Sequence, residues 1–303
     1  MRSAVRSALV LATLAAGACT ESGPRAASTG TVRVTDHYGQ QVALAGPASR
    51  VVSLIPASTE MVLALGAADR LVARTDYDTW PALDALPSVG QGLTPSLEWL
   101  LALEPDLVIA WQDAQARSVV AQLRATGVAV YGVRLESVSE VERTIRDLGV
   151  LLGRASAADS VLAALSADLG RARAIAEHAS RPRVLYPISL EPPYIAGPGS
   201  FVDELITIAG GENVFADLRS PWPQVSLEEI LRRQPDVLVT AVIPEEDNQL
   251  ERFRSLRGWR DLDAVRNGRV YVVDAELFNR PGPRLGHAAV QLARLLHPDT
   301  AAP

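Results

Sequence analysis

A pattern of sixteen residues occurs twice in this chain at a constant offset. SLEWLLALEPDLVIAW covers residues 96–111 and SLEEILRRQPDVLVTA covers residues 226–241, so Ser, Leu, Glu, Leu, Pro and Asp recur 226 − 96 = 130 positions apart. In each copy a Ser-Leu-Glu helix start leads to a Pro-Asp pair and a short apolar run, which is typical of a buried strand. A repeat at this spacing in a chain of 303 residues indicates two structurally similar halves.

Strand and helix patterns alternate in both halves. Strands are predicted at 50–56, 105–111, 127–133, 183–189, 235–241 and 269–274, and helices at 57–66, 113–126, 137–153 and 200–215. For the first helix, Ser58 or Thr59 is the expected N-cap and Gly66 the expected C-cap. This alternation predicts an α/β fold with two Rossmann-like βα sandwich lobes whose sheets are mainly parallel.

The segment 153–181 separates the two halves and is rich in strong helix formers. It predicts one long rigid helix of about 25 residues, roughly 38 Å, between the lobes. A stiff connection of this kind argues against a large hinge closure. The predicted divisions are a signal peptide at 1–18, a tether at 19–31, an N-terminal lobe at 32–152, the linking helix at 153–181 and a C-terminal lobe at 182–303.

The N-terminus is typical of an export signal. Arg2 and Arg6 precede an apolar run at 8–18 that is too short to span a bilayer. The motif AGAC resembles a bacterial lipobox, which would make Cys19 the acylated first residue of the mature chain; an ordinary secretory signal with a chance cysteine is the alternative. We therefore expect an exported protein, held at the cell envelope by a lipid anchor and without a transmembrane helix.

Particular segments resemble one family. PDLVIAW (105–111), PPY (192–194), GGENVF (210–215) and above all PWPQVS (221–226) are similar to the cobalamin-binding members of the helical-backbone solute-binding proteins that serve ABC importers. The resemblance extends from about residue 50 to residue 296. It implies a monomer that captures a corrinoid between its lobes and delivers it to a permease dimer.

Five residues fall at ligand-binding positions of that family. Trp111 ends a predicted strand, where open α/β sheets place their ligands, and Trp222 lies between two prolines that stiffen its loop. Tyr77 matches a third aromatic, and Glu276 and Arg280 match polar positions that could bond the side amides of a corrin. The alternative for the two tryptophans is that they are packing residues. The alternative for Glu276 and Arg280 is a surface ion pair, which contributes little energy. No residue is expected to coordinate the cobalt, and no cofactor is expected.

The chain departs from the family pattern at two places. Gly92 stands where the cobalamin binder has a tryptophan, so one wall of the pocket would be thinner. Ala209 and Ala293 replace a disulfide pair, so the C-terminal helix would be held by packing alone.

The glutamates of the repeat have two interpretations. Glu98 and Glu228 each lie in the first turn of a helix, where a carboxylate complements the helix dipole. The resemblance implies more, because these positions are docking glutamates that meet arginines of the permease, one on each lobe. Two permease subunits present two equivalent surfaces, which a pair of matched anchors would fit.

Other functions are less well supported. The net charge of −6 and the lack of basic runs argue against nucleic-acid binding. Four histidines, none in a predicted cleft segment, argue against a metal receptor. Motifs of serine hydrolases, P-loop enzymes and zinc proteases are absent, which argues against an enzyme. A ferri-siderophore or haem binder of the same fold is the main alternative.

Overall fold

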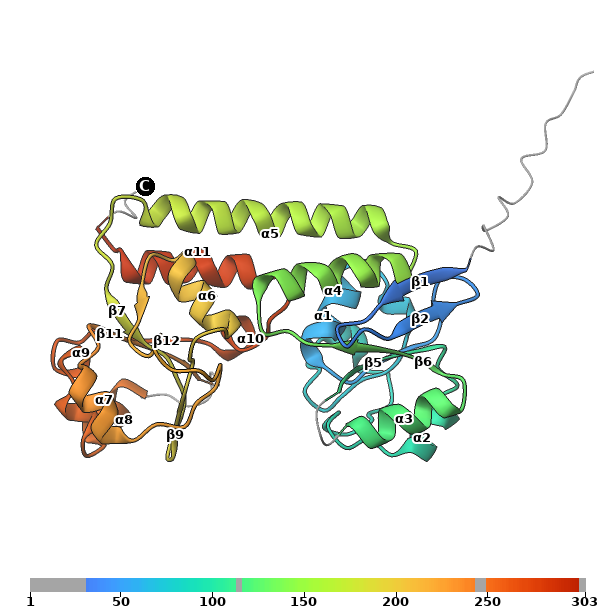
Figure 1. The fold of residues 1–303 in the computed structure, drawn as a ribbon, viewed down its shortest axis with the longest axis horizontal. Coiled ribbons are helices and arrows are strands. Elements are labelled where there is room, and N and C mark those ends of the chain that lie inside the picture. Colours follow the sequence, from blue (N-terminus) through green and yellow to red (C-terminus); the bar gives the residue numbers. More distant parts are fainter. Residues whose placement is uncertain (1–30, 113–115, 243–248, 300–303) are drawn as a thin grey trace, which may run out of the picture.

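The computed structural model describes residues 31–112, 116–242 and 249–299, and these form two lobes beneath one long helix (Figure 1). The predicted signal peptide, Cys19 and nearly all of the tether lie outside the described residues. Within the described residues, no helix is both long and apolar enough to cross a membrane. The predicted fold class is confirmed, because each lobe carries a parallel sheet covered by helices.

The sheet of the N-terminal lobe has the order β4-β3-β5-β6, and all of its pairings are parallel. Its strands are short and apolar: β3 (Val51–Ser53), β4 (Leu71–Ala73), β5 (Leu107–Trp111) and β6 (Ala129–Val133). Its helices are α1 (Pro56–Ala64), α2 (Leu97–Ala102), α3 (Arg117–Ala125) and α4 (Val138–Leu151). A hairpin of β1 (Val32–Thr35) and β2 (Gln41–Leu44) precedes them.

The C-terminal lobe repeats this topology, with the order β10-β7-β11-β12 and parallel pairings. The strands are β7 (Arg183–Leu185), β10 (Glu212–Asn213), β11 (Val237–Val242) and β12 (Val270–Asp274), with a separate hairpin of β8 (Pro187–Leu190) and β9 (Pro193–Ile195). The helices are α6 (Phe201–Ile208), α7 (Leu227–Arg233), α8 (Gln249–Ser255), α9 (Asp263–Arg266), α10 (Ala275–Phe278) and α11 (Leu285–Leu296). Strands β5 and β11, which carry the sequence repeat, hold equivalent places in the two sheets.

The linking helix is α5 (Ala155–Ala176), 22 residues long, and it lies across both lobes (Figure 1). It packs on α4 of the first lobe and on α11 of the second. Two glycines allow this close approach, because a Cβ at Gly149 of α4 would overlap Ala158 and a Cβ at Gly286 of α11 would overlap Asp168. Helix α5 therefore packs closely against both lobes along its length, in addition to its covalent connections to them.

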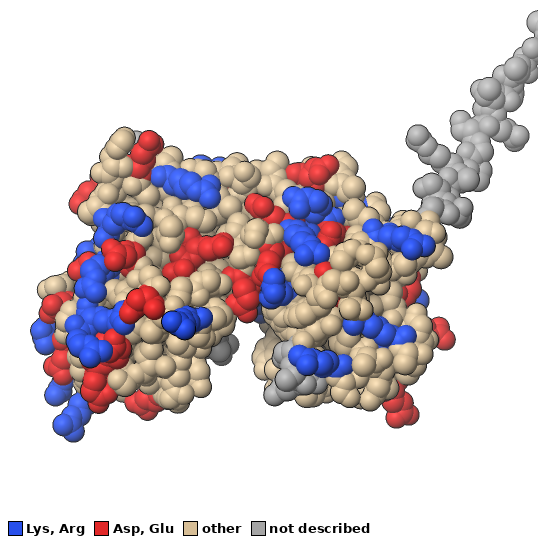
Figure 2. Space-filling model, viewed as in Figure 1, with Lys and Arg blue, Asp and Glu red and all other residues tan. Residues whose placement is uncertain are grey.

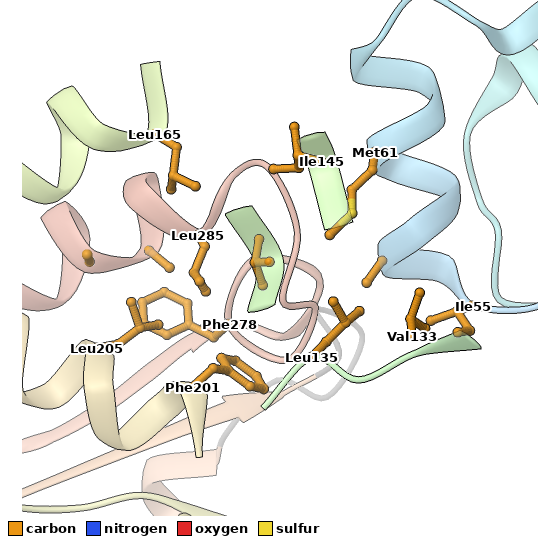
Figure 3. Close-up of a cluster of buried hydrophobic side chains, with 14 of the residues drawn as sticks. Ile55, Met61, Val133, Leu135, Ile145, Leu165, Phe201, Leu205, Phe278 and Leu285 are labelled. Carbon is orange, nitrogen blue, oxygen red and sulfur yellow. The ribbon is translucent and has the colours of Figure 1, made fainter. Parts of the chain in front are cut away.

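One hydrophobic core runs through both lobes (Figure 3). Met61 and Ile145 of the N-terminal lobe belong to the same buried cluster as Leu165 of α5 and Phe201 and Phe278 of the C-terminal lobe. Opening the lobes would expose this apolar surface to water, which is unfavourable. The continuous core therefore opposes separation of the lobes, and the extent of their movement on binding stays a prediction.

The predictions of local structure need three corrections. The helix predicted at 200–215 ends at Ile208, because Gly210 leaves the helical conformation at φ +79°, and β10 follows it. Helix α1 begins at Pro56, and neither Ser58 nor Thr59 caps it, because proline at the first helical position has no N–H group to satisfy. The strand predicted at 183–189 divides into β7 and β8, because Pro187 lacks the N–H that would continue the ladder.

The expectation for the C-terminal helix is incomplete. Ala209 and Ala293 are both fully buried, and packing does hold α11. However, the His297 Nε2 atom also lies 2.9 Å from the Ala209 carbonyl oxygen, and the Arg284 side chain just before α11 bonds Glu60 of the other lobe. Polar contacts therefore hold both ends of α11.

Candidate functional site: the cleft between the lobes

A cavity of about 580 Å³ lies between the two lobes. The molecular surface is notched there, on the side away from α5 (Figure 2). Its walls come from the carboxyl ends of β3 and β5, from the loop after β4, and from the segment around α10. The lining residues are Ile55, Pro56, Ala57, Asp76, Tyr77, Thr79, Trp111, Asp274, Ala275, Glu276, Asn279, Arg280 and Pro281. Carboxyl ends of parallel strands are where α/β folds bind ligands.

Two aromatic side chains line the wall on the N-terminal lobe. Trp111 is the last residue of β5 and is half-buried against the main core. Tyr77 lies in the loop after β4 and has 50% of its surface exposed. Both were predicted from the sequence, and the structure places them in the same pocket. Together they offer flat apolar faces to a ligand.

The wall on the C-terminal lobe is built by α10. Asp274 caps this helix by accepting the N–H of Glu276, 2.8 Å away. The Glu276 Oε1 atom accepts the Thr79 hydroxyl at 2.9 Å, and the Arg280 Nη2 group donates to the Tyr77 carbonyl oxygen at 2.9 Å. Glu276 and Arg280 thus line the pocket and also join the two lobes.

These bonds occupy only some of the N–H donors of the Arg280 guanidinium. Its carbon lies 5.1 Å from the centre of the Trp80 ring, and its Nη2 atom lies 3.2 Å from Glu276 Oε1. Its Nη1 atom is buried and has no hydrogen-bond partner among the described residues. Arg280 therefore holds one buried donor that no described residue satisfies.

Trp222 does not line this pocket. Its indole Nε1–H donates to Glu136 Oε2 of the other lobe at 2.9 Å, and its ring packs against Phe201 with centroids 5.7 Å apart. It therefore lies at the boundary between the lobes. Its role in ligand binding stays a prediction.

Two carboxylates of the pocket were missed by sequence reasoning, Asp76 and Asp274. The sequence could have indicated both residues, since Asp76 directly precedes Tyr77 and Asp274 is the last residue of a predicted strand. With Glu276 they give the lining three acidic side chains against one basic side chain, Arg280. The pocket rim is thus rich in hydrogen-bond acceptors and carries net negative charge.

Gly92 does not line the cavity. It is buried at φ +82°, and a Cβ built on this backbone would overlap the Leu54 carbonyl oxygen. The expectation that Gly92 makes one wall of the pocket thinner stays a prediction.

The two helices of the repeat start in the same way. Ser96 accepts the N–H of Trp99 at the start of α2, and Ser226 accepts the N–H of Glu229 at the start of α7. Glu98 and Glu228 are both exposed, and neither has an ion pair or hydrogen bond through its side chain within the described part of the chain. Figure 1 places α2 and α7 on different lobes, at the end of the molecule away from α5.

The described residues contain no cluster of three or more His, Cys, Asp or Glu side chains arranged to hold a metal ion. Burial raises the pKa of the Tyr186 hydroxyl, which donates to Asn279 Oδ1 at 2.9 Å beneath the pocket. Tyr186 therefore stays protonated and orients the Asn279 side chain.

This two-lobed fold with a helical connection and a cleft at the strand ends is that of a binding protein. The chain belongs to the periplasmic binding protein family, which residues 51–277 match. It is 31% identical over 277 residues to an uncharacterised ABC transporter substrate-binding lipoprotein, YvrC, of Bacillus subtilis, covering 89% of this chain and 86% of the relative. It is 32% identical over 255 residues to the vitamin B12-binding protein of Vibrio cholerae, covering 82% and 90%.

Solved structures show the same fold. The periplasmic vitamin B12-binding protein BtuF of Vibrio cholerae superposes with a TM-score of 0.73 at 30% identity, covering 84% of this chain and 99% of that one. The haem-binding protein RhuT of Roseiflexus sp. RS-1 gives 0.74 at 28% identity, covering 83% and 99%. A protein of an Fe³⁺-hydroxamate transport system from Saccharomonospora viridis gives 0.73 at 27% identity, covering 88% and 98%.

The family fixes the general activity. This protein is an extracytoplasmic substrate-binding protein that takes a small molecule to an ABC transporter, and it is not an enzyme.

Proposed function

We propose that this protein binds a corrinoid such as cobalamin in the cleft and delivers it to an importer permease. The observation that carries this proposal is the combination of Tyr77 and Trp111 with a rim of acceptors at Asp76, Asp274 and Glu276. A corrin is a broad, partly apolar plate edged with amides. Aromatic faces suit the plate, and carboxylates accept hydrogen bonds from amide N–H groups.

The charge of the pocket favours a corrinoid over the main alternatives. Haem carries two propionates and many ferri-siderophores are anionic, so both would meet three carboxylates and a single arginine. Like charges at short range in a partly closed site are unfavourable. The lining residues include no His or Cys, so the cobalt of a bound corrinoid would keep its own axial ligands. A haem or siderophore binder remains the second candidate, since proteins of those kinds share this fold.

Calorimetric titration tests this assignment. The soluble chain, residues 20–303, is titrated with cyanocobalamin, cobinamide, haem and a ferric hydroxamate. We expect one-to-one binding of cyanocobalamin in the range of about 10 nM to 1 µM. Trp111→Ala is expected to weaken it by roughly tenfold or more, whereas Trp99→Ala, an exposed tryptophan outside the pocket, serves as the control. Heat with haem or the hydroxamate but none with either corrinoid would overturn the ligand assignment.

We further propose that Glu98 and Glu228 are the two contacts with the permease. Both are exposed carboxylates at the starts of equivalent helices, and they lie away from α5 on separate lobes. Exposed ion pairs contribute little energy, but at an interface they fix orientation and speed encounter.

A matched pair of double variants tests this docking. Glu98→Ala with Glu228→Ala is expected to keep its ligand affinity and to lose most uptake in cells that carry the importer. Asp159→Ala with Glu177→Ala removes two exposed carboxylates from α5 and its end instead, and should leave uptake unchanged. Equal uptake by the two double variants would contradict the docking proposal.

Finally, we propose that Cys19 carries the lipid anchor. The lipobox-like motif supports this, as does the lipoprotein named among the relatives. Metabolic labelling with an alkyne fatty acid should label the chain, and Cys19→Ser should lose the label and release the protein from membranes.

A further inference from the structure

The turn between β1 and β2 is fastened to the N-terminal lobe by one buried carboxylate, that of Asp36. Its side chain is fully buried. The Oδ1 atom accepts the backbone N–H groups of Tyr38 at 2.9 Å and Gln40 at 2.8 Å, which closes the turn on itself. The backbone N–H of His37 donates to the Gly132 carbonyl oxygen at 3.1 Å, so the turn covers the edge of β6.

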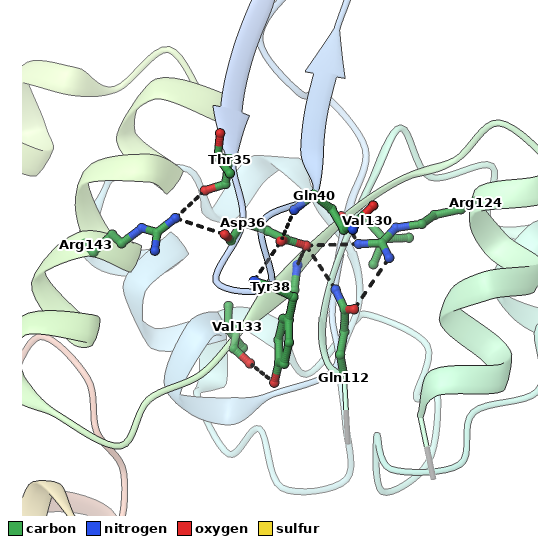
Figure 4. Close-up of polar contacts among 10 residues, drawn as sticks. Thr35, Asp36, Tyr38, Gln40, Gln112, Arg124, Val130, Val133 and Arg143 are labelled. Atoms are coloured by element: carbon green, nitrogen blue, oxygen red, sulfur yellow. Dashed lines mark hydrogen bonds and ion pairs between the residues drawn. The ribbon is translucent and has the colours of Figure 1, made fainter. Parts of the chain in front are cut away.

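The second oxygen of Asp36 reaches into the lobe (Figure 4). Asp36 Oδ2 accepts the side-chain amide of Gln112 at 3.0 Å, a guanidinium N–H of Arg124 at 3.0 Å and the backbone N–H of Gly132 at 3.2 Å. Both oxygens are therefore fully bonded, which a buried carboxylate requires. A network in which every member is satisfied holds its geometry closely.

Gln112 connects this network to the ligand cleft, because it directly follows Trp111. The ladder between β5 and β6 ends at the pair Trp111 and Val133, so Gln112 lies just beyond the regular pairing. Its side chain crosses β6 at Gly132, where any Cβ would overlap the Gln112 amide group. The bond to Asp36 therefore holds the Gln112 side chain against β6.

The turn is also held from the opposite side. The Arg143 Nη2 group of α4 donates to the carbonyl oxygens of Thr35 at 2.6 Å and Asp36 at 2.9 Å (Figure 4). The Tyr38 hydroxyl donates to the Val133 carbonyl oxygen at 3.2 Å. The turn that carries Asp36 is therefore fixed to α4 and to β6 by these hydrogen bonds.

We infer that Asp36 is a positioning residue for the binding cleft, which fixes the Trp111 wall through the Gln112 side chain. A residue that supports a ligand-contacting side chain without touching the ligand determines how precisely that side chain is positioned. Neither Asp36 nor Gln112 lines the cavity, so neither can act by touching the ligand. The effect on affinity rests on the proposed corrinoid function, but the effect on Trp111 does not.

The test measures Trp111 directly in the unliganded protein. Acrylamide quenching is recorded with and without Trp111→Phe, and the difference reports Trp111 alone among five tryptophans. Gln112→Ala removes only the link and is expected to raise the quenching of Trp111, with a change in melting temperature of no more than about 3 °C. Asp36→Asn should act in the same direction. Gln122→Ala on α3, whose exposed amide donates to Ser118 Oγ at 3.4 Å and has no other partner among the described residues, is the matched control.

The second readout is affinity for cyanocobalamin, which Gln112→Ala is expected to weaken by roughly tenfold while Gln122→Ala leaves it unchanged. If Asp36→Asn does not fold, Gln112→Ala decides the matter, because Gln112 is only partly buried. Unchanged Trp111 quenching in Gln112→Ala would overturn the inference whatever the ligand. Failure of the wild type to bind cyanocobalamin would overturn the proposed ligand, while the quenching result would still judge the role of Asp36.

Discussion

Gly92 occupies a backbone conformation at which a side chain is doubly unfavourable. Its φ of +82° is strained for any residue with a Cβ, and that Cβ would overlap the Leu54 carbonyl oxygen. Leu54 directly precedes Ile55, which lines the cleft, so the close approach at Gly92 fixes the backbone behind the pocket. The resemblance to a family in which tryptophan occupies this place could not reveal this, because it compares side chains and not backbone angles.

Gly92→Ala is therefore expected to lower the free energy of unfolding by about 2–4 kcal/mol, from the combined strain and overlap. Gly90→Ala is the control, since Gly90 also has a positive φ, +79°, but open space around its Cβ. It should cost only about 1 kcal/mol. Urea denaturation of the two variants measures both values, and equal losses would mean that the chain relaxes around residue 92.

His37 gives the chain a stability that depends on pH. Its ring is buried, with Nε2 3.0 Å from the Thr144 hydroxyl and Nδ1 without a partner among the described residues. Burial, followed by the charge of Arg143, lowers the pKa of His37 below its ordinary 6.5. Glu140 and Asp147 oppose this shift and Arg134 adds to it, but the net direction is downward.

Because the folded pKa lies below the unfolded one, the unfolded state binds more protons once the pH falls below about 6.5. The stability that neutral His37 provides is present above that pH and is lost as the pH falls toward the folded pKa. We expect the wild type to lose more unfolding free energy than His37→Gln between about pH 7.5 and pH 5. Parallel losses in the two proteins would assign the pH dependence to other groups.

At the scale of elements, most of the strands and helices could be predicted from the sequence. The β-branched runs gave β5, β6, β11 and β12, and the helical spacing gave α4 and α5, because local patterns determine these elements. The split of β7 from β8 depends on which neighbour each strand pairs with, so a single apolar run could not predict it. The bond from the Trp222 indole N–H to Glu136 of the other lobe likewise depends on the placement of the two lobes, so the loop sequence alone could not predict it.

The seating of α5 on α11 depends on one glycine. In Gly286→Ala, the new Cβ would overlap Asp168 and would lie 3.0 Å from the Leu165 carbonyl oxygen. Helix α11 must therefore move away from α5. We expect a loss of about 1–3 kcal/mol in the free energy of unfolding. Gly170→Ala, in α5 with open space at its Cβ, should instead stabilise the protein by about 0.5–1 kcal/mol. Thermal denaturation compares the two, and a stabilising Gly286→Ala would show that the helices are not in close contact.

At the scale of the whole molecule, the repeat predicts two similar lobes but not how they meet. The contacts between lobes join residues that have no counterpart in the repeat, such as Thr79 with Glu276 and the Val138 N–H with Glu204. Such pairs depend on the placement of one lobe against the other. Only the structure therefore shows that Glu276 and Arg280 connect the two lobes.

The ion pair of Glu60 with Arg284 is a partly buried polar contact between the lobes. The Glu60 side chain of α1 is 8% exposed and the Arg284 side chain before α11 is 39% exposed. Arg284 donates through Nε and Nη2 to the Glu60 carboxylate, which raises the pKa of Arg284 above its ordinary value. Its Nη2 group also donates to the Glu276 carbonyl oxygen at 3.3 Å, so the pair supports the wall of the cleft.

The unequal burial predicts unequal consequences when either partner is removed. Arg284→Ala leaves a buried carboxylate without its counter-charge, which should lower the free energy of unfolding by about 2–4 kcal/mol. Glu60→Ala leaves a guanidinium that water can reach, and should cost only about 1 kcal/mol. The double variant should be more stable than Arg284→Ala alone, because the isolated charge is then absent. Urea denaturation of the three proteins measures this cycle, and equal losses for the two single variants would mean that water reaches Glu60 and that the lobes separate there more readily than their continuous core implies.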